Sequence, residues 1–118
     1  MISREFNINL DIIKINKYIK PIQVYQNDIY QYILNITVSR NDKRINLDHK
    51  DAIIHILKSN SELIKYNNYE ILDNTLKVRV ADIDEVGQHA LHIMLVNENQ
   101  KLTLPIIKFE VLPNEEIL

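Results

Sequence analysis

The chain of 118 residues contains no cysteine, no tryptophan and a single glycine, Gly87. Without cysteine it can form neither a disulfide framework nor a thiolate metal site, and it has no cysteine nucleophile. With one glycine, its tight turns must be built by asparagine and aspartate, the other residues that best tolerate left-handed backbone conformations. The absence of tryptophan removes the aromatic side chain best suited to stacking on sugars. We therefore expect asparagine-rich turns in an ordinary folded domain.

The sequence also lacks a large excess of charge of one sign, and it has no long hydrophobic run. Fourteen lysines and arginines oppose sixteen aspartates and glutamates, giving a net charge of −2, and no basic run extends beyond Lys43-Arg44. Nucleic-acid binders normally show a clustered positive face, so we expect no nucleic-acid partner. Polar residues interrupt Met1–Asp11, and no stretch approaches the ~18 apolar residues of a membrane span. We expect one domain, with no signal peptide and no membrane insertion.

Short segments of alternating apolar and polar residues are what the sequence does contain. The alternation is clearest from Tyr30 through Leu34 to Val38, which is typical of a strand with one face in the core. Turn signals recur about every 8 to 12 residues, the pattern of an antiparallel β-sandwich, here with seven to nine strands. Strands are predicted near residues 6–15, 20–25, 30–38, 45–47, 52–58, 63–72, 75–80, 86–96 and 102–111.

Local composition places some of these strands within the sandwich. Pro21 cannot donate a ladder hydrogen bond, which predicts that residues 20–25 form an edge strand. Residues 52–58 are almost uniformly apolar, which predicts a strand covered on both faces. Residues 63–72 are expected to form a weaker hairpin partner.

The last third of the chain predicts a closing hairpin. Gly87 opens an apolar run, the polar cluster Asn97–Lys101 forms the turn, and a second apolar run ends at Val111. Acidic residues in the segment 81–86 favour a turn of helix before the hairpin. The residues expected to face the core are His89, Leu91, Ile93 and Leu95 on the first strand and Ile107, Phe109 and Val111 on the second.

Two groups of side chains are of metal-ligand type. Asp48, His49, Asp51 and His55 lie within eight residues. On an extended strand, however, residues 49 and 55 would be about 20 Å apart, at about 3.3 Å per residue, and could not share an ion. The acidic residues of segment 81–86 lack the spacing and central glycine of an EF-hand loop. We therefore expect no metal and no other cofactor.

The sequence also lacks the patterns of nucleophilic or acid–base catalysis. No serine lies in a Gly-x-Ser-x-Gly elbow, and the acidic residues are scattered through predicted turns instead of facing one another across a cleft. His89 and His92 fall on opposite faces of one strand and cannot act together. His89 is expected to be a hydrogen-bonded core residue, and the protein is not expected to be an enzyme.

The six tyrosines are the side chains best suited to binding a partner, because an aromatic ring with a polar tip is favoured at interfaces. Tyr30 and Tyr32 are in phase with the core. The other candidates are expected to contact a partner, and protein is favoured over carbohydrate because tryptophan is absent. These partner-binding candidates are Tyr18, Tyr25, Tyr66 and Tyr69.

The order and spacing of several short motifs resemble a known family, the N-terminal domain of phage baseplate upper proteins. The resemblance covers residues 20–112 and implies an immunoglobulin-like β-sandwich from the tail baseplate of phages that infect Gram-positive bacteria. The turn after Lys58 departs from the family pattern, because it lacks the usual Asp-Gly pair. The motifs are Val24–Asp28, Asn41–Leu47, Ala52–Lys58, Val86-Gly87, Asn97–Lys101 and Phe109–Val111.

This resemblance implies a non-enzymatic structural component that docks onto other phage tail or baseplate proteins and forms a homo-oligomer. Its place would be the tail of the virion, after assembly in the host cytoplasm. Residues 1–19 would be an N-terminal arm or first strand, facing a partner or exchanged between subunits, and residues 113–118 a C-terminal tail. Two other hypotheses remain: a carbohydrate-binding module for a host cell-wall polymer, and a bacterial adhesin or regulatory interaction domain that reached a similar fold independently.

Overall fold

The computed structural model describes residues 2–13, 20–26, 30–80, 83 and 85–113, and all regular structure in these ranges is β-strand. The all-β prediction is therefore confirmed. The strands of the described part number eleven, more than the seven to nine expected, partly because two predicted segments are each split in two. The strands are β1 (Ile2–Asp11), β2 (Ile22–Tyr25), β3 (Tyr30–Arg40), β4 (Lys43–Arg44), β5 (Asp51–Leu57), β6 (Leu63–Tyr66), β7 (Tyr69–Leu72), β8 (Thr75–Val80), β9 (Gly87–Asn97), β10 (Gln100–Thr103) and β11 (Ile107–Leu112).

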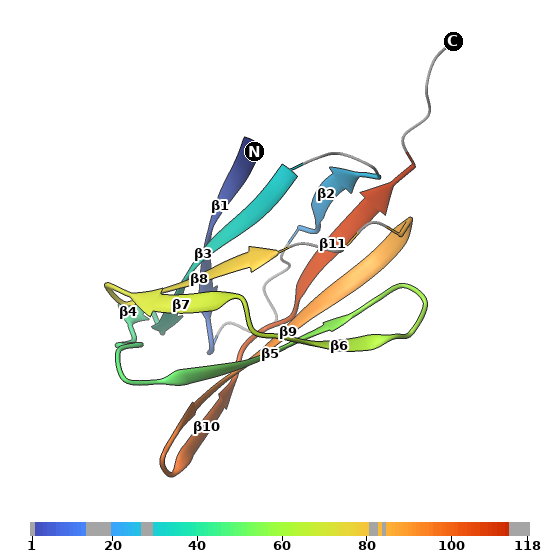
Figure 1. Ribbon diagram of the computed structural model, residues 1–118. Helices are drawn as coiled ribbons and strands as arrows, with labels where there is room; N and C mark the ends of the chain where they lie inside the picture. Colours follow the sequence, from blue (N-terminus) through green and yellow to red (C-terminus); the bar gives the residue numbers. More distant parts are fainter. Residues whose placement is uncertain (1, 14–19, 27–29, 81–82, 84, 114–118) are drawn as a thin grey trace.

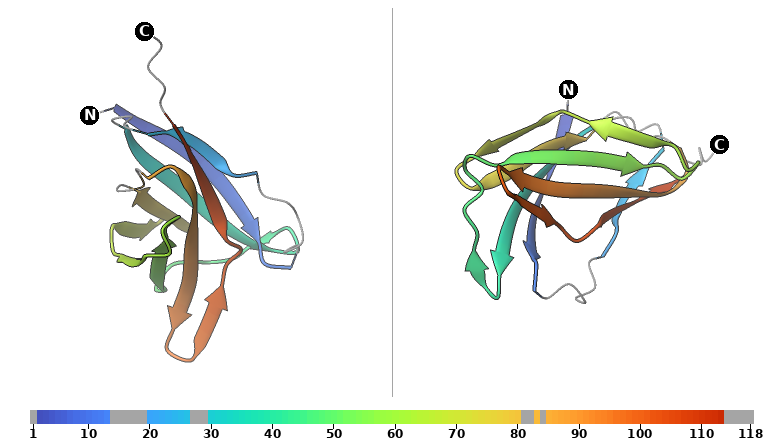
Figure 2. Two further views of the ribbon diagram at one scale, coloured as in Figure 1. Left: turned by 90° about the vertical axis from the view of Figure 1, so that its right-hand side faces the viewer. Right: turned by 90° about the horizontal axis from the view of Figure 1, so that it is seen from below.

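The strands form two sheets that pack against each other as a sandwich (Figures 1 and 2). Sheet A has the order β1-β3-β8-β7, with β4 beside the end of β3, and sheet B has the order β2-β11-β9-β5-β6, with β10 beside β9. Both sheets are mixed, because β1 pairs with β3 and β2 with β11 in parallel. The purely antiparallel expectation was wrong on this point, since alternation within a strand carries no information about the direction of its neighbour.

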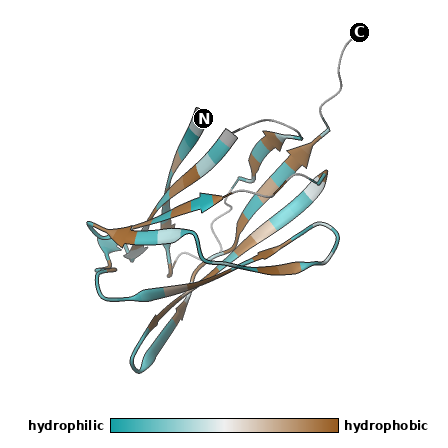
Figure 3. Ribbon diagram, in the orientation of Figure 1, coloured by the Kyte–Doolittle hydropathy of each residue, from teal (hydrophilic) through white to brown (hydrophobic). Residues whose placement is uncertain are grey.

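The core lies between the sheets and comes from the alternating positions of both (Figure 3). On β3, Tyr32, Leu34, Ile36 and Val38 are buried, as the period-2 pattern predicted. The predicted inward residues of β8, β9 and β11 are buried as well. Those residues are Leu76, Val78 and Val80 on β8, His89, Leu91, Ile93 and Leu95 on β9, and Ile107, Phe109 and Val111 on β11.

Residues 2–11 form a full strand of sheet A, paired with β3 from Ile2↔Tyr30 to Asp11↔Ser39. Polar side chains reinforce this parallel pair. The Asn9 Oδ1 accepts hydrogen bonds from Thr37 Oγ1 at 3.3 Å and from Ser39 Oγ at 3.1 Å. Residues 14–19, the remainder of the predicted N-terminal segment, lie outside the described ranges.

Two of the tight hairpin turns use asparagine and aspartate in the left-handed conformation, as the shortage of glycine predicted, whereas His49 and Ser61 adopt it in two other turns. Asn41 and Asp42 join β3 to β4 with φ values of 51° and 68°, and Asp73 and Asn74 join β7 to β8 with 52° and 58°. Two consecutive residues with positive φ are the requirement of a type I′ hairpin turn, which matches the twist of the strands it connects. At these positions asparagine and aspartate carry a modest backbone strain that glycine would not have.

Three predicted elements differ from the structure. β5 alternates between buried and less buried residues, so only one of its faces belongs to the core. Residues 63–72 are not one strand, because β6 pairs with β5 in sheet B whereas β7 pairs with β8 in sheet A. In the segment 81–86 no helix is present at the described residues: Ile83 is buried, and Glu85 and Val86 form a bend. Ala81, Asp82 and Asp84 lie outside the described residues.

The closing hairpin is confirmed, although its second strand is interrupted. β10 pairs with the end of β9, Leu102 opposite Leu95, and β11 pairs with its beginning, Ile107 opposite Leu91. Pro105 lies in the break between them and has no N–H to donate to β9. β2 is paired only with β11 among the described strands, so its predicted place at a sheet edge is also confirmed.

Candidate functional site

The candidate tyrosines lie on three different edge strands. Tyr25 is on β2, at one edge of sheet B, and is 53% exposed. Tyr66 is on β6, at the opposite edge of the same sheet, and Tyr69 is on β7, at the edge of sheet A. Both are half-buried and pack against the core, and the Tyr69 hydroxyl accepts a hydrogen bond from the Ala52 N–H at 3.2 Å. The structure therefore does not gather these side chains into one patch, and Tyr18 lies outside the described residues.

The four residues of metal-ligand type between 48 and 55 belong to a turn and a strand. Asp48 and His49 precede β5, and the Asp48 Oδ1 accepts a hydrogen bond from the Asn74 N–H at 3.4 Å. His55 lies on the outer face of β5, directly opposite His92 of β9. Across the part of the chain that the structure describes, no three His, Cys, Asp or Glu side chains come together in a way that could hold a metal ion.

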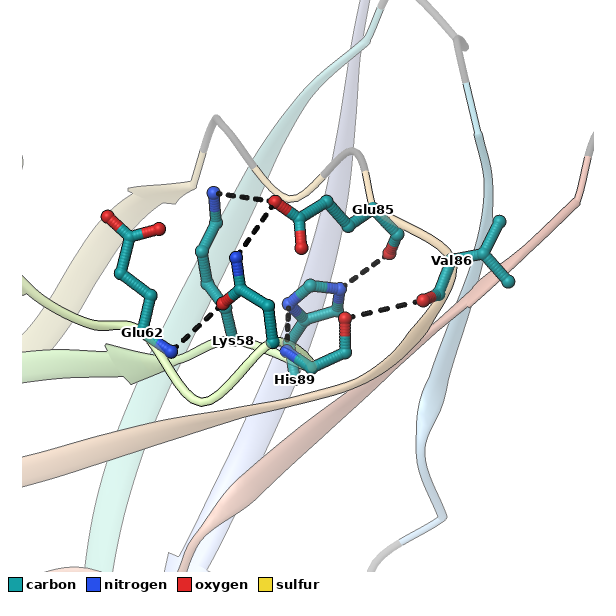
Figure 4. Close-up of polar contacts among 7 residues, drawn as sticks. Lys58, Glu62, Glu85, Val86 and His89 are labelled. Carbon is teal, nitrogen blue, oxygen red and sulfur yellow. Dashed lines mark hydrogen bonds and ion pairs between the residues drawn. The ribbon is translucent and has the colours of Figure 1, made fainter.

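His89 is the centre of a polar cluster that joins the β5–β6 turn to the segment before β9 (Figure 4). Its Nε2 lies 2.7 Å from the Glu85 carbonyl oxygen, and its Nδ1 is 3.4 Å from the Ser59 amide nitrogen. Because a carbonyl oxygen only accepts and an amide N–H only donates, Nε2 carries the proton and Nδ1 accepts. The ring is 1% exposed, which confirms the prediction of a hydrogen-bonded core histidine.

The other contacts in this cluster also connect the β5–β6 turn to residues 85 and 86 before β9. The Glu85 Oε1 accepts a hydrogen bond from Asn60 Nδ2 at 3.2 Å and lies 3.8 Å from Lys58 Nζ. The Ser59 hydroxyl donates to the Val86 carbonyl at 3.3 Å. Figure 4 shows these contacts bridging the turn and the strand entry. The cluster has a structural role, because its polar groups form hydrogen bonds and an ion pair with one another.

A groove beside charged side chains lies at one end of the sandwich. It has a volume of about 580 Å³ and lies between the ends of β1, β3 and β4 on one side and the β9–β10 hairpin on the other. Its polar lining comes from three cations and three amides, and its apolar lining is aliphatic. We call it the end groove; its lining residues are Arg40, Lys50 and Lys101, Asn97, Asn99 and Gln100, and Ile12, Ile45, Leu95 and Leu102.

The end groove could not have been found by a local sequence pattern. Its cations come from the end of β3, the loop before β5 and the second strand of a hairpin, and are separated by up to about half the chain. Within the described part of the chain, its lining includes no carboxylate. The arrangement suits non-covalent binding of an anionic group, because it offers several donors beside an apolar surface.

Comparison with known proteins places this chain in one family. The sequence profile of the BppU N-terminal domain, the N-terminal domain of phage baseplate upper proteins, matches residues 4–116. The chain therefore belongs to this family. The match begins well before residue 20, where the resemblance seen in the sequence began, and so includes most of the first strand. No curated protein sequence matches the chain.

The fold is also shared with a solved structure, the N-terminal domain of phage TP901-1 ORF48. The two superpose with a TM-score of 0.66 at 13% sequence identity, over 93% of this chain and 98% of the other. At this identity the likeness establishes the fold. The family establishes the class: this chain is a structural domain of a phage tail baseplate. The described residues include no helix that could cross a membrane.

Proposed function

We propose that this chain is a non-enzymatic component of the virion tail that docks onto neighbouring tail proteins through its immunoglobulin-like sandwich. The observation that carries the proposal is the family match, which runs through nearly all strands of both sheets. In this proposal the chain assembles in the host cytoplasm and self-associates as it takes its place in the baseplate. Its role is to hold neighbouring subunits in position.

The exposed apolar side chains on the edge strands support docking. Leu63 on β6 is 61% exposed and Leu72 on β7 is 65% exposed, and both strands are sheet edges. Edge strands present backbone donors and acceptors to a second chain, and adjacent apolar side chains add area that a partner can bury. Such positions fit a protein partner better than a small molecule.

Among the four tyrosines, Tyr25 is the best placed to contact a partner, because it is more than half exposed on the short edge strand β2. Tyr66 and Tyr69 present only part of their rings and would lie at the margin of a contact. Tyr18 and the rest of the segment 14–19 complete the proposed partner-facing region. Among the described strands, β1 forms an edge of sheet A, so the proposed N-terminal contact would add to that sheet.

Co-purification with the tail proteins encoded beside this chain tests the proposal. We expect the tagged chain to retain at least one of them through size-exclusion chromatography, and the variants Tyr25→Ser and Leu72→Ser then show which edge is used. Both variants remove an exposed apolar side chain, so circular dichroism should be unchanged. If no tail protein is retained by the wild-type chain, the docking function is wrong.

Titration with cell-wall polymer separates this proposal from the carbohydrate-binding alternative. Wall teichoic acid and peptidoglycan fragments are expected to show no saturable binding by calorimetry. Saturable binding at micromolar concentration would favour a carbohydrate-binding module instead. The same protein preparation serves for both experiments, which makes the two results directly comparable.

A further inference from the structure

The positive charge of the end groove favours an anionic ligand. Arg40, Lys50 and Lys101 contribute three positive charges to the lining, and none of the described lining residues carries a carboxylate. Among the described residues, none of these three side chains forms an ion pair. A ligand with closely spaced carboxylates would therefore gain charge-assisted hydrogen bonds without displacing an internal partner.

The apolar lining of the end groove separates a peptide ligand from a sugar ligand. Ile12, Ile45, Leu95 and Leu102 are aliphatic, and none of the described residues that line the groove is aromatic. Sugar sites commonly use an aromatic ring as a stacking platform, whereas aliphatic side chains of a peptide pack well against isoleucine and leucine. The ligand that fits is a peptide with carboxylates beside aliphatic side chains.

The chain itself contains such a peptide. Its last residues are Pro113-Asn114-Glu115-Glu116-Ile117-Leu118, in which two glutamates precede isoleucine and leucine. The two carboxylates match the cations of the groove, and the two aliphatic side chains match its apolar lining. The C-terminal segment is thus complementary to the end groove in both charge and hydrophobicity.

The segment cannot reach the groove of its own molecule. β11 runs antiparallel to β9 and ends beside the start of β9, with Val111 opposite Gly87, whereas the groove lies at the other end of β9, near Asn97 (Figure 1). Ten residue steps along β9 span about 33 Å. The six residues after Leu112 reach at most about 20 Å when fully extended. Only a second copy can therefore supply this segment.

We propose that the end groove binds the C-terminal segment 113–118 of a second copy of this chain, with the glutamates on Arg40 and Lys101 and the aliphatic side chains against Ile45 and Leu102. Such a contact is head-to-tail, because it joins two different surfaces of the same protein. A head-to-tail contact closes into a ring or continues as an open filament, depending on the rotation between copies. The proposal deepens the self-association part of the proposed function and rests on it.

Charge reversal tests the contact. The double variant Arg40→Glu/Lys101→Glu should lose self-association in analytical ultracentrifugation at concentrations where the wild-type chain associates, and deletion of residues 114–118 should do the same. Adding Glu115→Lys/Glu116→Lys to the groove variant should restore association, because the charges are then exchanged. The control Lys65→Glu/Lys108→Glu makes the same change in net charge at exposed positions outside the groove and should have no effect.

Binding of a synthetic peptide provides a second measurement. The peptide Pro-Asn-Glu-Glu-Ile-Leu should bind to the chain lacking residues 114–118, more weakly as salt is raised, and at least about tenfold more weakly to the groove double variant. An unrelated acidic peptide or teichoic acid that binds the groove in its place would overturn the proposal. So would a chain that stays monomeric, or a groove variant that associates normally.

The same variants distinguish the failure of this contact from the failure of the docking function. If the Arg40→Glu/Lys101→Glu chain associates like the wild type but still co-purifies with neighbouring tail proteins, the groove contact is wrong and the docking function stands. If the wild-type chain retains no tail protein yet the peptide binds as expected, the groove contact stands and the docking function is wrong.

Discussion

The Nε2 of His89 lies 2.7 Å from the backbone carbonyl oxygen of Glu85, four residues earlier in the chain. This contact, and the one from Ser59 N–H to Nδ1, hold the loop before β9 against the β5–β6 turn. A buried histidine, opposite Phe109 in the sheet, thus satisfies two backbone groups outside the strand ladders. His89, a residue type often found in catalytic and metal sites, therefore has a structural role here.

Replacing His89 by leucine should lower the free energy of unfolding by about 2 kcal/mol, because the Ser59 N–H and the Glu85 carbonyl would lose their partner. Urea denaturation followed by circular dichroism measures this loss. The control is His92→Leu, on the outer face of the same strand, which should change stability by less than about 0.5 kcal/mol. Equal effects of the two substitutions would contradict the role given to His89.

The tautomer of His89 is a separate prediction. Its ring should be neutral with the proton on Nε2, because Nε2 donates to a carbonyl oxygen and Nδ1 accepts from an N–H. The 15N chemical shifts of the two ring nitrogens report this directly in a long-range heteronuclear spectrum. Shifts that place the proton on Nδ1 would mean that the ring is turned over.

Gly87 has a backbone conformation and a close neighbour that disfavour any residue with a Cβ. Its φ is +127°, and a Cβ built on it would lie 2.8 Å from the Ser59 Cβ. We expect Gly87→Ala to lower the free energy of unfolding by about 1–3 kcal/mol through backbone strain alone, with the clash adding to it. Adding Ser59→Gly removes the clash but not the strain, so the double variant should recover part of the loss, as thermal or urea unfolding would measure. A fully stable Gly87→Ala chain would show that this contact is not formed.

The parallel pairing of β1 depends on Asn9. Asn9→Ala removes an acceptor used by Thr37 and by Ser39, which is only 6% exposed, and should lower stability by about 1 kcal/mol. Amide hydrogen exchange should speed up in β1 more than in β9. The comparison variant Asn7→Ala loses one exposed hydrogen bond, from Asn35, and should cost less. Uniform exchange across both sheets would indicate that Asn9 does not hold this strand in particular.

Much of the fold follows from short-range pattern. The alternation in residues 30–38 and 75–80 is visible without any partner, because side chains of a strand alternate between its two faces. The turns at Asn41-Asp42 and Asp73-Asn74 follow from the scarcity of glycine. What could not be predicted is pairing between distant strands. The parallel neighbours of β1 and β2, and the passage of residues 63–72 from one sheet to the other, are decided by packing across the whole domain.

In the candidate sites, too, local features are predictable from the sequence, whereas features that depend on distant segments are not. The place of His89 in the core is predictable from the sequence, because its phase with Leu91 is local. The end groove is not predictable, because Arg40, Lys50 and Lys101 come from three separate segments and meet only through the fold. Tyr25 is exposed on an edge strand, but the separation of the described candidate tyrosines over three edges could not be deduced from spacing alone.

The central claim, that this chain is a structural part of a phage tail, is tested most directly on purified particles of the phage that encodes it. Gold-labelled antibody against the chain, viewed by electron microscopy, should mark the baseplate end of the tail in intact virions. Label on the capsid, or particles that carry no label although the chain is abundant in infected cells, would contradict the claim.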